Sequence, residues 1–375
     1  MKSGLLFPVI TACLALANPV AAANTLPQPS LKAKIGQMIM VGFTGTSSRF
    51  KGAKAVIEQL REGSIGGVML MRHNIGSKNQ LRQLTRALHQ ATCSGRQLPA
   101  LIAVDQEGGA VQRLKFTRYP SARRIATKTS AQIAQTYNNM ARELASTGIN
   151  VNFGPVVDLD LRGAANPIIG RLSRSYGRDP KTVIRLARQF ISAHKGHGIV
   201  TAAKHFPGHG SSLKDSHKGF TAIPQWNRLG NELAPFATLA NDQSVDMVMI
   251  GHLYNKIWGA PASLSHRAVS GILREQIGFS GIAITDDMEM GAIRKNYKWQ
   301  TAVIGAVNAG NDILLYSNTV SHTRFLGRKI RNTIIKALCS TENRANCIKS
   351  QTINNAYQRI ARLKHRLPAT TNTCR

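Results

Sequence analysis

Acidic residues are scarce in this 375-residue chain, which carries 18 Asp and Glu against 49 Lys and Arg and has a formal net charge of +31. Such a field attracts anionic polymers without selecting among them. The sequence holds no recognised nucleic-acid-binding motif and no basic stripe interleaved with aromatic residues, so no specific nucleic acid is expected as a partner. We expect either nonspecific contact with anionic polymers or a basic surface that is simply solvated.

Cysteine is also rare, with five residues and no Cys-x-x-Cys spacing of the kind that holds zinc. Four of them, Cys93, Cys339, Cys347 and Cys374, lie beyond the N-terminal segment and allow three pairings. A bridge between Cys339 and Cys347 would close a short loop and leave Cys93 to pair with Cys374.

Long apolar runs are missing after residue 23, since none approaches the roughly 20 residues that span a bilayer. No transmembrane segment is therefore expected, and the mature chain should be soluble. Residues 1–23 have a basic start, an apolar stretch over 5–17 and small residues before position 24, which is the layout of a cleaved secretory signal. The protein should be periplasmic or secreted. Lipoprotein processing at Cys13 is the less favoured alternative, because apolar residues continue beyond it.

Short apolar, β-branched runs alternate with segments whose apolar residues recur at three- and four-residue spacing. The runs predicted as strands cover 38–43, 67–71, 101–104, 149–153, 199–203, 245–250, 281–285 and 312–316. The segments predicted as helices cover 51–61, 78–92, 130–146, 181–196, 267–276 and 301–309. Eight such units predict an α/β fold of the TIM type, a (β/α)8 barrel with a single catalytic domain.

An open, doubly wound sheet is the alternative fold, but no Gly-x-Gly-x-x-Gly opens a helix in a first strand-helix-strand unit. We place the barrel domain at 24–320. The remainder, 321–375, is predicted to be a basic helical extension packed on the barrel.

Polar clusters follow five of the predicted strands, where a barrel carries its catalytic groups. The clusters are Asp105 to Gly109, Gly154 to Asp158, Lys204 to His217, Gly251-His252 and Asp286-Asp287. The third is the richest, because Lys204-His205-Phe206-Pro207-Gly208-His209-Gly210 precedes Asp215-Ser216-His217 on a predicted loop. His217 is the natural proton carrier there, since an imidazole changes charge near neutral pH.

This loop resembles that of family 3 glycoside hydrolases, and specifically of their β-N-acetylglucosaminidase subgroup. The segment 272–286, which ends at Asp286, resembles the nucleophile signature of the same family. The segments 105–113 and 174–180 add two further motifs in the same order, so the resemblance covers the chain from about 35 to 318.

The resemblance implies a retaining exo-hydrolase that removes terminal β-linked N-acetylglucosamine from peptidoglycan fragments or chitooligosaccharides through a covalent glycosyl-enzyme. It assigns Asp286 as nucleophile and His217 as acid/base, assisted by Asp215. Retention requires an anion on one face of the sugar and a proton donor at the leaving oxygen, which suits this pair. The sugar-binding positions of the family fall on Asp105, Arg113, Arg174, Lys204 and His205.

Several assignments have a plainer alternative. Asp287 competes with Asp286 as nucleophile; we favour Asp286 because it directly follows the predicted strand. His209 is interpreted as a structural histidine. Glu289 and Ala110 depart from the residues usual in the family, which leaves substrate preference open.

Rival functions remain open from the sequence. Among enzymes they are a family 3 β-glucosidase and a β-N-acetylglucosaminide phosphorylase. A cationic envelope-binding protein on a barrel scaffold is a rival of another class. A metal hydrolase using His205, His209 and His217 is not favoured, because their spacing is not that of a helical His-Glu-x-x-His site. No metal and no cofactor are expected.

Overall fold

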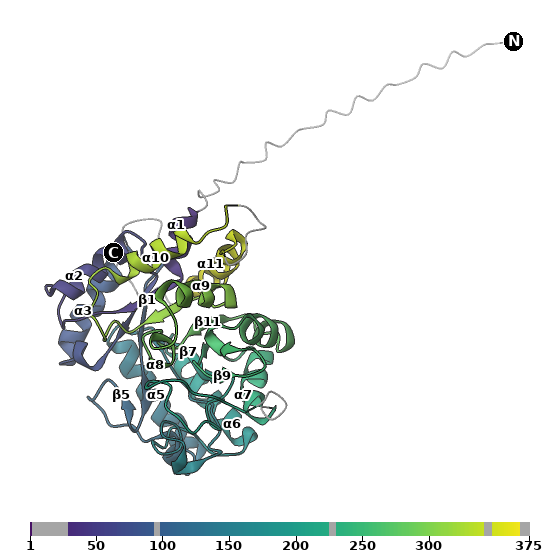
Figure 1. Cartoon of the computed structure of the whole chain (residues 1–375). Coiled ribbons are helices and arrows are strands. Elements are labelled where there is room, and N and C mark those ends of the chain that lie inside the picture. Colours follow the sequence, from purple (N-terminus) through teal and green to yellow (C-terminus); the bar gives the residue numbers. More distant parts are fainter. Residues whose placement is uncertain (2–28, 94–97, 225–229, 341–346, 368–375) are drawn as a thin grey trace.

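The computed structural model of the chain describes residues 1, 29–93, 98–224, 230–340 and 347–367. Eight parallel strands form one sheet in the order β11-β8-β7-β6-β3-β2-β1-β12. The outer strands β11 and β12 meet through a bridge between Ile284 and Ile313, so the sheet closes on itself. The predicted barrel is confirmed (Figure 1).

The eight predicted strands are all present within a few residues of their expected ends. The barrel strands are β1 (Ile39–Gly42), β2 (Gly67–Leu70), β3 (Leu101–Val104), β6 (Val151–Asn152), β7 (Val200–Phe206), β8 (Met247–Ile250), β11 (Ile282–Thr285) and β12 (Leu314–Tyr316). Every residue of these strands is buried. This is expected for strands that pack against helices on one face and against the barrel interior on the other. Two small hairpins, β4 (Gln106–Gly108) with β5 (Val111–Gln112) and β9 (Tyr254–Asn255) with β10 (Ala260–Pro261), lie outside this sheet.

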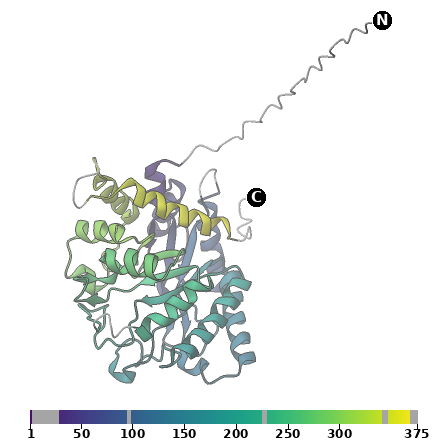
Figure 2. The same cartoon turned by 90° about the vertical axis from the view of Figure 1, so that its right-hand side faces the viewer.

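Helices cover the outside of the barrel between successive strands (Figure 2). They are α1 (Leu31–Gln37), α2 (Lys51–Arg61), α3 (Lys78–Gln90), α4 (Ala122–Ile125), α5 (Ser130–Ser146), α6 (Pro180–Gly196), α7 (Gly230–Asn241), the π-helix η5 (Arg267–Gln276), α8 (Gly291–Arg294), α9 (Trp299–Ala309), α10 (Leu326–Lys336) and α11 (Ser350–His365). The described residues also include the short 3-10 turns η1 (Arg72–Asn74), η2 (Gly163–Ala165) and η4 (Ala262–Leu264). No helix in the described part of the chain is both long and apolar enough to cross a bilayer.

Local side chains start several of these helices. Ser77 accepts a hydrogen bond from the backbone of Gln80 at the start of α3, and Thr129 forms a reciprocal capping box with Gln132 at the start of α5. Asp179 caps α6, whose first residue is Pro180. These signals explain why the predicted helix starts agree with the structure.

Helices α10 and α11 both pack against α1 (Figure 1). Helix α10 also packs on β1 and α9, and a disulfide between Cys339 and Cys347 joins the segments next to α10 and α11. The predicted boundary at 320 stays a prediction. Cys93 is also a disulfide cysteine, but its predicted partner Cys374 lies outside the described residues.

Among the features that differ from the sequence prediction, two concern the surroundings of β7. Strand β7 continues through Phe206, so Lys204 and His205 belong to a buried strand and not to the loop that follows it. Helix α7 was not predicted, because Pro235 interrupts its helical pattern.

Candidate active site

A cavity of about 330 Å³ opens at the carboxyl ends of the barrel strands. It is lined by residues of β2, β4, β5, β7, β8 and β12 and by residues of the connections that follow β3, β6, β7 and β11. Seven of the eight predicted site residues line it: Asp105, Arg113, Arg174, Lys204, His205, His217 and Asp286. The eighth, Asp215, is placed by its contact with His217. The barrel therefore gathers in one place residues from four separate motifs.

Two carboxylates and three cations form an array of ion pairs in the cavity wall. The Lys204 ammonium lies 2.8 Å from Asp105 and 2.7 Å from Glu107, and the Arg174 guanidinium binds Glu107 through two hydrogen bonds of 2.8 Å. Arg113 donates to the second oxygen of Asp105 at 3.1 Å. Burial alone would raise the pKa of both carboxyl groups, but the adjacent cations outweigh it and lower both values. The carboxylates of the array are thus ionised, and the ion pairs hold it in one geometry.

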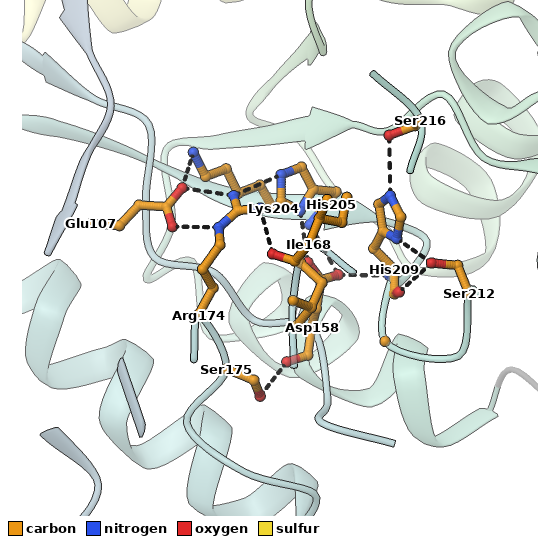
Figure 3. A network of polar contacts seen from close by, with 12 residues as sticks. Glu107, Asp158, Ile168, Arg174, Ser175, Lys204, His205, His209, Ser212 and Ser216 are labelled. Atoms are coloured by element: carbon orange, nitrogen blue, oxygen red, sulfur yellow. Dashed lines mark hydrogen bonds and ion pairs between the residues drawn. The ribbon is translucent and has the colours of Figure 1, made fainter. Parts of the chain in front are cut away.

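A buried aspartate holds the turn that follows β7 (Figure 3). Asp158 has no solvent-exposed side-chain surface, and it accepts the Nδ1 hydrogen of His205 at 2.7 Å. It also accepts the backbone N–H groups of His205 at 3.2 Å and of His209 at 2.7 Å. The remaining ring nitrogen of His205 faces Arg174 at 3.4 Å, which fixes the orientation of the imidazole toward the cavity.

Asp286 follows the last residue of β11 and is enclosed by histidines. Burial favours its neutral form, yet the imidazoles of His205, His252 and His217 outweigh that effect and lower its pKa. Asp287 behaves in the opposite way, because burial raises its pKa to about 6. Its carboxylate accepts the backbone N–H groups of Ser317 and Glu289 at 2.9 and 3.1 Å. Asp286 is therefore the better anion and Asp287 the more structural group.

His217 projects from the loop after β7 and has a side chain that is 60% exposed. Its ring Nδ1 and its backbone N–H both donate to Asp215 Oδ1, at 2.8 and 2.9 Å. This contact leaves Nε2 as the ring atom that can exchange a proton with a ligand. The ring of His209, by contrast, is buried, and its two nitrogens contact the hydroxyls of Ser212 and Ser216.

Sequence reasoning did not select Glu107 and Asp158. Both lie in polar clusters that were recognised at strand ends, but a carboxylate that contacts only other protein groups has no distinctive local pattern. Their partners, Arg174 and His205, are 67 and 47 positions away.

The three histidines considered as metal ligands do not converge. His205 contacts Asp158, His209 contacts two serines, and His217 contacts Asp215. Within the described ranges, no group of three or more His, Cys, Asp or Glu side chains is placed to hold a metal ion. Another cavity, of about 400 Å³, lies at the opposite ends of the strands against α3 and the ends of α5 and α6, and it contains none of the predicted site residues.

Residues 30–363 match the model of the glycosyl hydrolase family 3 N-terminal domain. The chain belongs to glycoside hydrolase family 3. Beta-hexosaminidase from Alkalilimnicola ehrlichii is 34% identical over 75% of this chain and 80% of its own length. Beta-hexosaminidase LpqI from Mycobacterium tuberculosis is 34% identical over 76% of this chain and 73% of its own.

Solved structures of family 3 agree with this placement. A family 3 β-N-acetylglucosaminidase from Paenibacillus superposes with a TM-score of 0.82 at 30% identity and covers 92% of this chain. The match spans 64% of that longer protein, and 55% of beta-hexosaminidase A from Pseudoalteromonas piscicida. These comparisons confirm the membership of family 3 that the motifs predicted. They also agree with the predicted barrel fold.

Proposed function

We propose that this family 3 protein is a retaining exo-β-N-acetylglucosaminidase that hydrolyses terminal β-linked N-acetylglucosamine from peptidoglycan fragments or chitooligosaccharides. The choice of N-acetylglucosamine as the sugar is supported by its relatives, which are named beta-hexosaminidase or β-N-acetylglucosaminidase. The observation that carries the chemistry is that Asp286, ionised, and His217, with Nε2 free, line the same cavity. An anion and a proton donor at one sugar-sized site are what a double displacement requires.

In the first half-reaction, the Asp286 carboxylate attacks the anomeric carbon while the protonated His217 ring gives its Nε2 proton to the glycosidic oxygen. The C–O bond breaks, the aglycone leaves as an alcohol, and a glycosyl ester forms on Asp286. In the second half, neutral His217 takes a proton from water, which attacks the same carbon and releases Asp286. Asp215, at 2.8 Å from Nδ1, stabilises the imidazolium form and keeps Nε2 directed at the reaction.

The sugar ring would be bound by Asp105, Arg113, Arg174, Lys204 and His205. Because Lys204 already bridges Asp105 and Glu107, this wall is organised before any ligand enters. Hydrogen bonds from such fixed groups to ring hydroxyls can strengthen as the ring flattens in the transition state.

We further propose that the protein acts in the periplasm or outside the cell. This rests on the signal-like residues 1–23, which, apart from Met1, lie outside the described residues. Its basic surface would then meet anionic envelope polymers, an interaction without sequence or sugar specificity.

The deciding experiment compares an aryl β-N-acetylglucosaminide with the matching glucoside for the parent, Asp286→Ala and His217→Ala. We expect release only from the first substrate. Asp286→Ala should abolish it, and His217→Ala should reduce it by a factor of about 100 or more, the usual contribution of a general acid. Mass spectrometry of quenched His217→Ala with an activated aryl glycoside should detect a glycosyl adduct, absent in Asp286→Ala.

Other outcomes separate the rival functions. Preferential cleavage of the glucoside would favour a β-glucosidase. Turnover that depends on added phosphate and yields a sugar phosphate would favour a phosphorylase. No turnover by the parent, together with salt-sensitive polymer binding unchanged in Asp286→Ala, would favour the envelope-binding protein.

A further inference from the structure

His209 contacts both halves of the loop that carries the acid/base dyad (Figure 3). The ring is 1% exposed. Its Nδ1 lies 2.6 Å from the hydroxyl of Ser212, and its Nε2 lies 3.1 Å from the hydroxyl of Ser216. Ser216 stands between Asp215 and His217, so this second contact reaches the middle of the dyad.

The hydrogen-bond pattern specifies the tautomer of this ring. Ser212 uses its single hydroxyl hydrogen to bond the carbonyl of His209 at 3.0 Å, so its oxygen must accept the Nδ1 hydrogen. Nε2 then carries a lone pair and accepts the hydroxyl hydrogen of Ser216. Burial lowers the pKa of His209 to about 4, which keeps the ring in this neutral form at neutral pH.

The His217 ring has little packing of its own to hold it, since 60% of its side chain is exposed. Its position depends on how the backbone of Ser216 and His217 is fixed. The first two residues of α8 hold this backbone. The Gly291 N–H donates to His217 O at 2.9 Å, and the Ala292 N–H donates to Ser216 O at 3.1 Å. The bond to His209 is the contact that ties the Ser216 side chain to the barrel.

His209 is in turn tied to the sugar-binding wall. Its backbone N–H donates to Asp158, the same carboxylate that orients His205. Glu232 of α7 accepts a hydrogen bond from the backbone N–H of Ser211 at 3.0 Å and so also holds this turn. The loop therefore starts on the same buried support as the residues proposed to bind the sugar.

We propose that His209 is a positioning residue for the acid/base, and that its hydrogen bond from Ser216 places His217 relative to the sugar held by the cavity wall. The inference rests on the proposed function, since it deepens the role of His217. It goes beyond our interpretation of His209 as a structural histidine.

A matched pair of substitutions isolates the bond. His209→Gln places an amide oxygen near the position of Nε2 and can still accept from Ser216. His209→Asn retains a donor near Nδ1 for Ser212 but reaches no further. Ser216→Ala removes the donor from the other side. His209→Asn and Ser216→Ala should therefore lose the hydrogen bond between residues 209 and 216, whereas His209→Gln should largely retain it.

The readout is kcat/KM for two N-acetylglucosaminides, one with an activated dinitrophenyl leaving group and one with a methoxyphenyl group that leaves only when protonated. His209→Asn and Ser216→Ala should lower the value for the second substrate by about tenfold or more and hardly change the first. His209→Gln should recover most of the loss. His209→Asn and Ser216→Ala remove the same hydrogen bond. The variant that combines the two changes should therefore be no slower than either single variant.

Equal losses with the two substrates, or additive losses in the double variant, would overturn the proposal in favour of a purely structural histidine. A second measurement does not need turnover. The His217 ring signals in NMR spectra, identified by their absence in His217→Ala, should be single in the parent and in His209→Gln. They should broaden or split in His209→Asn; unchanged signals would also overturn the proposal. Failure of the parent to hydrolyse either glycoside, with these spectra as expected, would contradict the proposed function alone.

Discussion

The neighbouring carboxylates Asp286 and Asp287 differ in charge behaviour although they share a backbone segment. Histidines surround the first, while the second is buried against backbone N–H groups and has its pKa raised to about 6. The sequence favoured Asp286 through its place after the strand. The physical distinction between the two depends on His205 and His252, which come from other strands and cannot be assigned by local pattern.

This difference makes a stability prediction for Asp287→Asn. An aspartate in the unfolded chain has a pKa of about 3.9, so between about pH 4 and 6 the folded parent binds more protons than the unfolded chain at this residue. Ionisation of Asp287 therefore lowers parent stability as the pH rises through this window. The variant lacks this loss, so its stability relative to the parent should increase by about 3 kcal/mol between pH 4 and 7.

Urea unfolding at several pH values checks this. Asp242→Asn is the matched control, because the pKa of Asp242 is lowered, with its bonds to Ser244 and Arg188 outweighing burial. Its stability relative to the parent should hardly change between pH 4 and 7, because a lowered carboxyl pKa alters stability only below about pH 4. If the difference in unfolding free energy between Asp287→Asn and the parent did not depend on pH, the pKa of Asp287 would not be raised in the folded protein.

At the scale of elements, α11 is attached to the barrel by an unusual buried lysine. Lys364 donates to Gln37 Oε1 at 2.7 Å and to the carbonyl of Gly66 at 2.6 Å, and both of these acceptors are neutral. Burial lowers its pKa to about 7. A nearby anchor is conventional: Asp312 pairs with Arg359 of α11 at 2.8 Å.

We expect Lys364 to make the parent more stable as the pH rises from about 7 toward 10. In this window the unfolded chain holds a proton on the lysine, whose unfolded pKa is about 10.4, while the folded chain has lost it. The slope contributed by this group approaches about 1.4 kcal/mol per pH unit. Lys364→Met should lack it.

Unfolding curves at pH 7, 8 and 9 test this difference, with the exposed Lys336→Met of α10 as control. Lys336→Met should follow the parent at every pH. Parallel pH profiles for Lys364→Met and the parent would show that the lysine is protonated in both states.

The strands and most helices could be predicted because their signals are local. Apolar periodicity and caps located α2 and α5 with their observed ends. Helix α7 escaped because Pro235 breaks the pattern while packing still supports the helix. The end of β7 escaped as well, since Lys204 and His205 are polar in sequence and become buried only when Asp105 and Asp158 pair with them.

For the whole molecule, the net charge of +31 overstates the free basic surface. Several cations of the C-terminal part are engaged: Arg328 pairs with Glu58 and Glu62, Arg366 pairs with Asp246, and Lys364 is buried. Exposed cations such as Lys329 and Arg362 remain for external anions.

We predict that the protein binds a sulfated polysaccharide such as heparin and that the affinity falls steeply with salt, because released counterions drive such binding. Asp286→Ala should bind with the same affinity and salt dependence, since the cavity is not involved. Titrations at increasing salt, with neutral dextran as control, measure this. Affinity that is insensitive to salt, or lost in Asp286→Ala, would contradict a nonspecific electrostatic origin.

By itself, the sequence determined the class of fold and selected residues that line one cavity, because apolar periodicity, caps and strand-end motifs are properties of neighbouring residues. The tertiary structure alone decided which charges meet. Lys204 reaches Asp105 across 99 positions and Arg174 reaches Glu107 across 67, and only closure of the barrel brings these pairs within hydrogen-bonding distance. The protonation states of the site follow from those meetings, since burial and neighbouring charge set a pKa and neither is written in the order of residues.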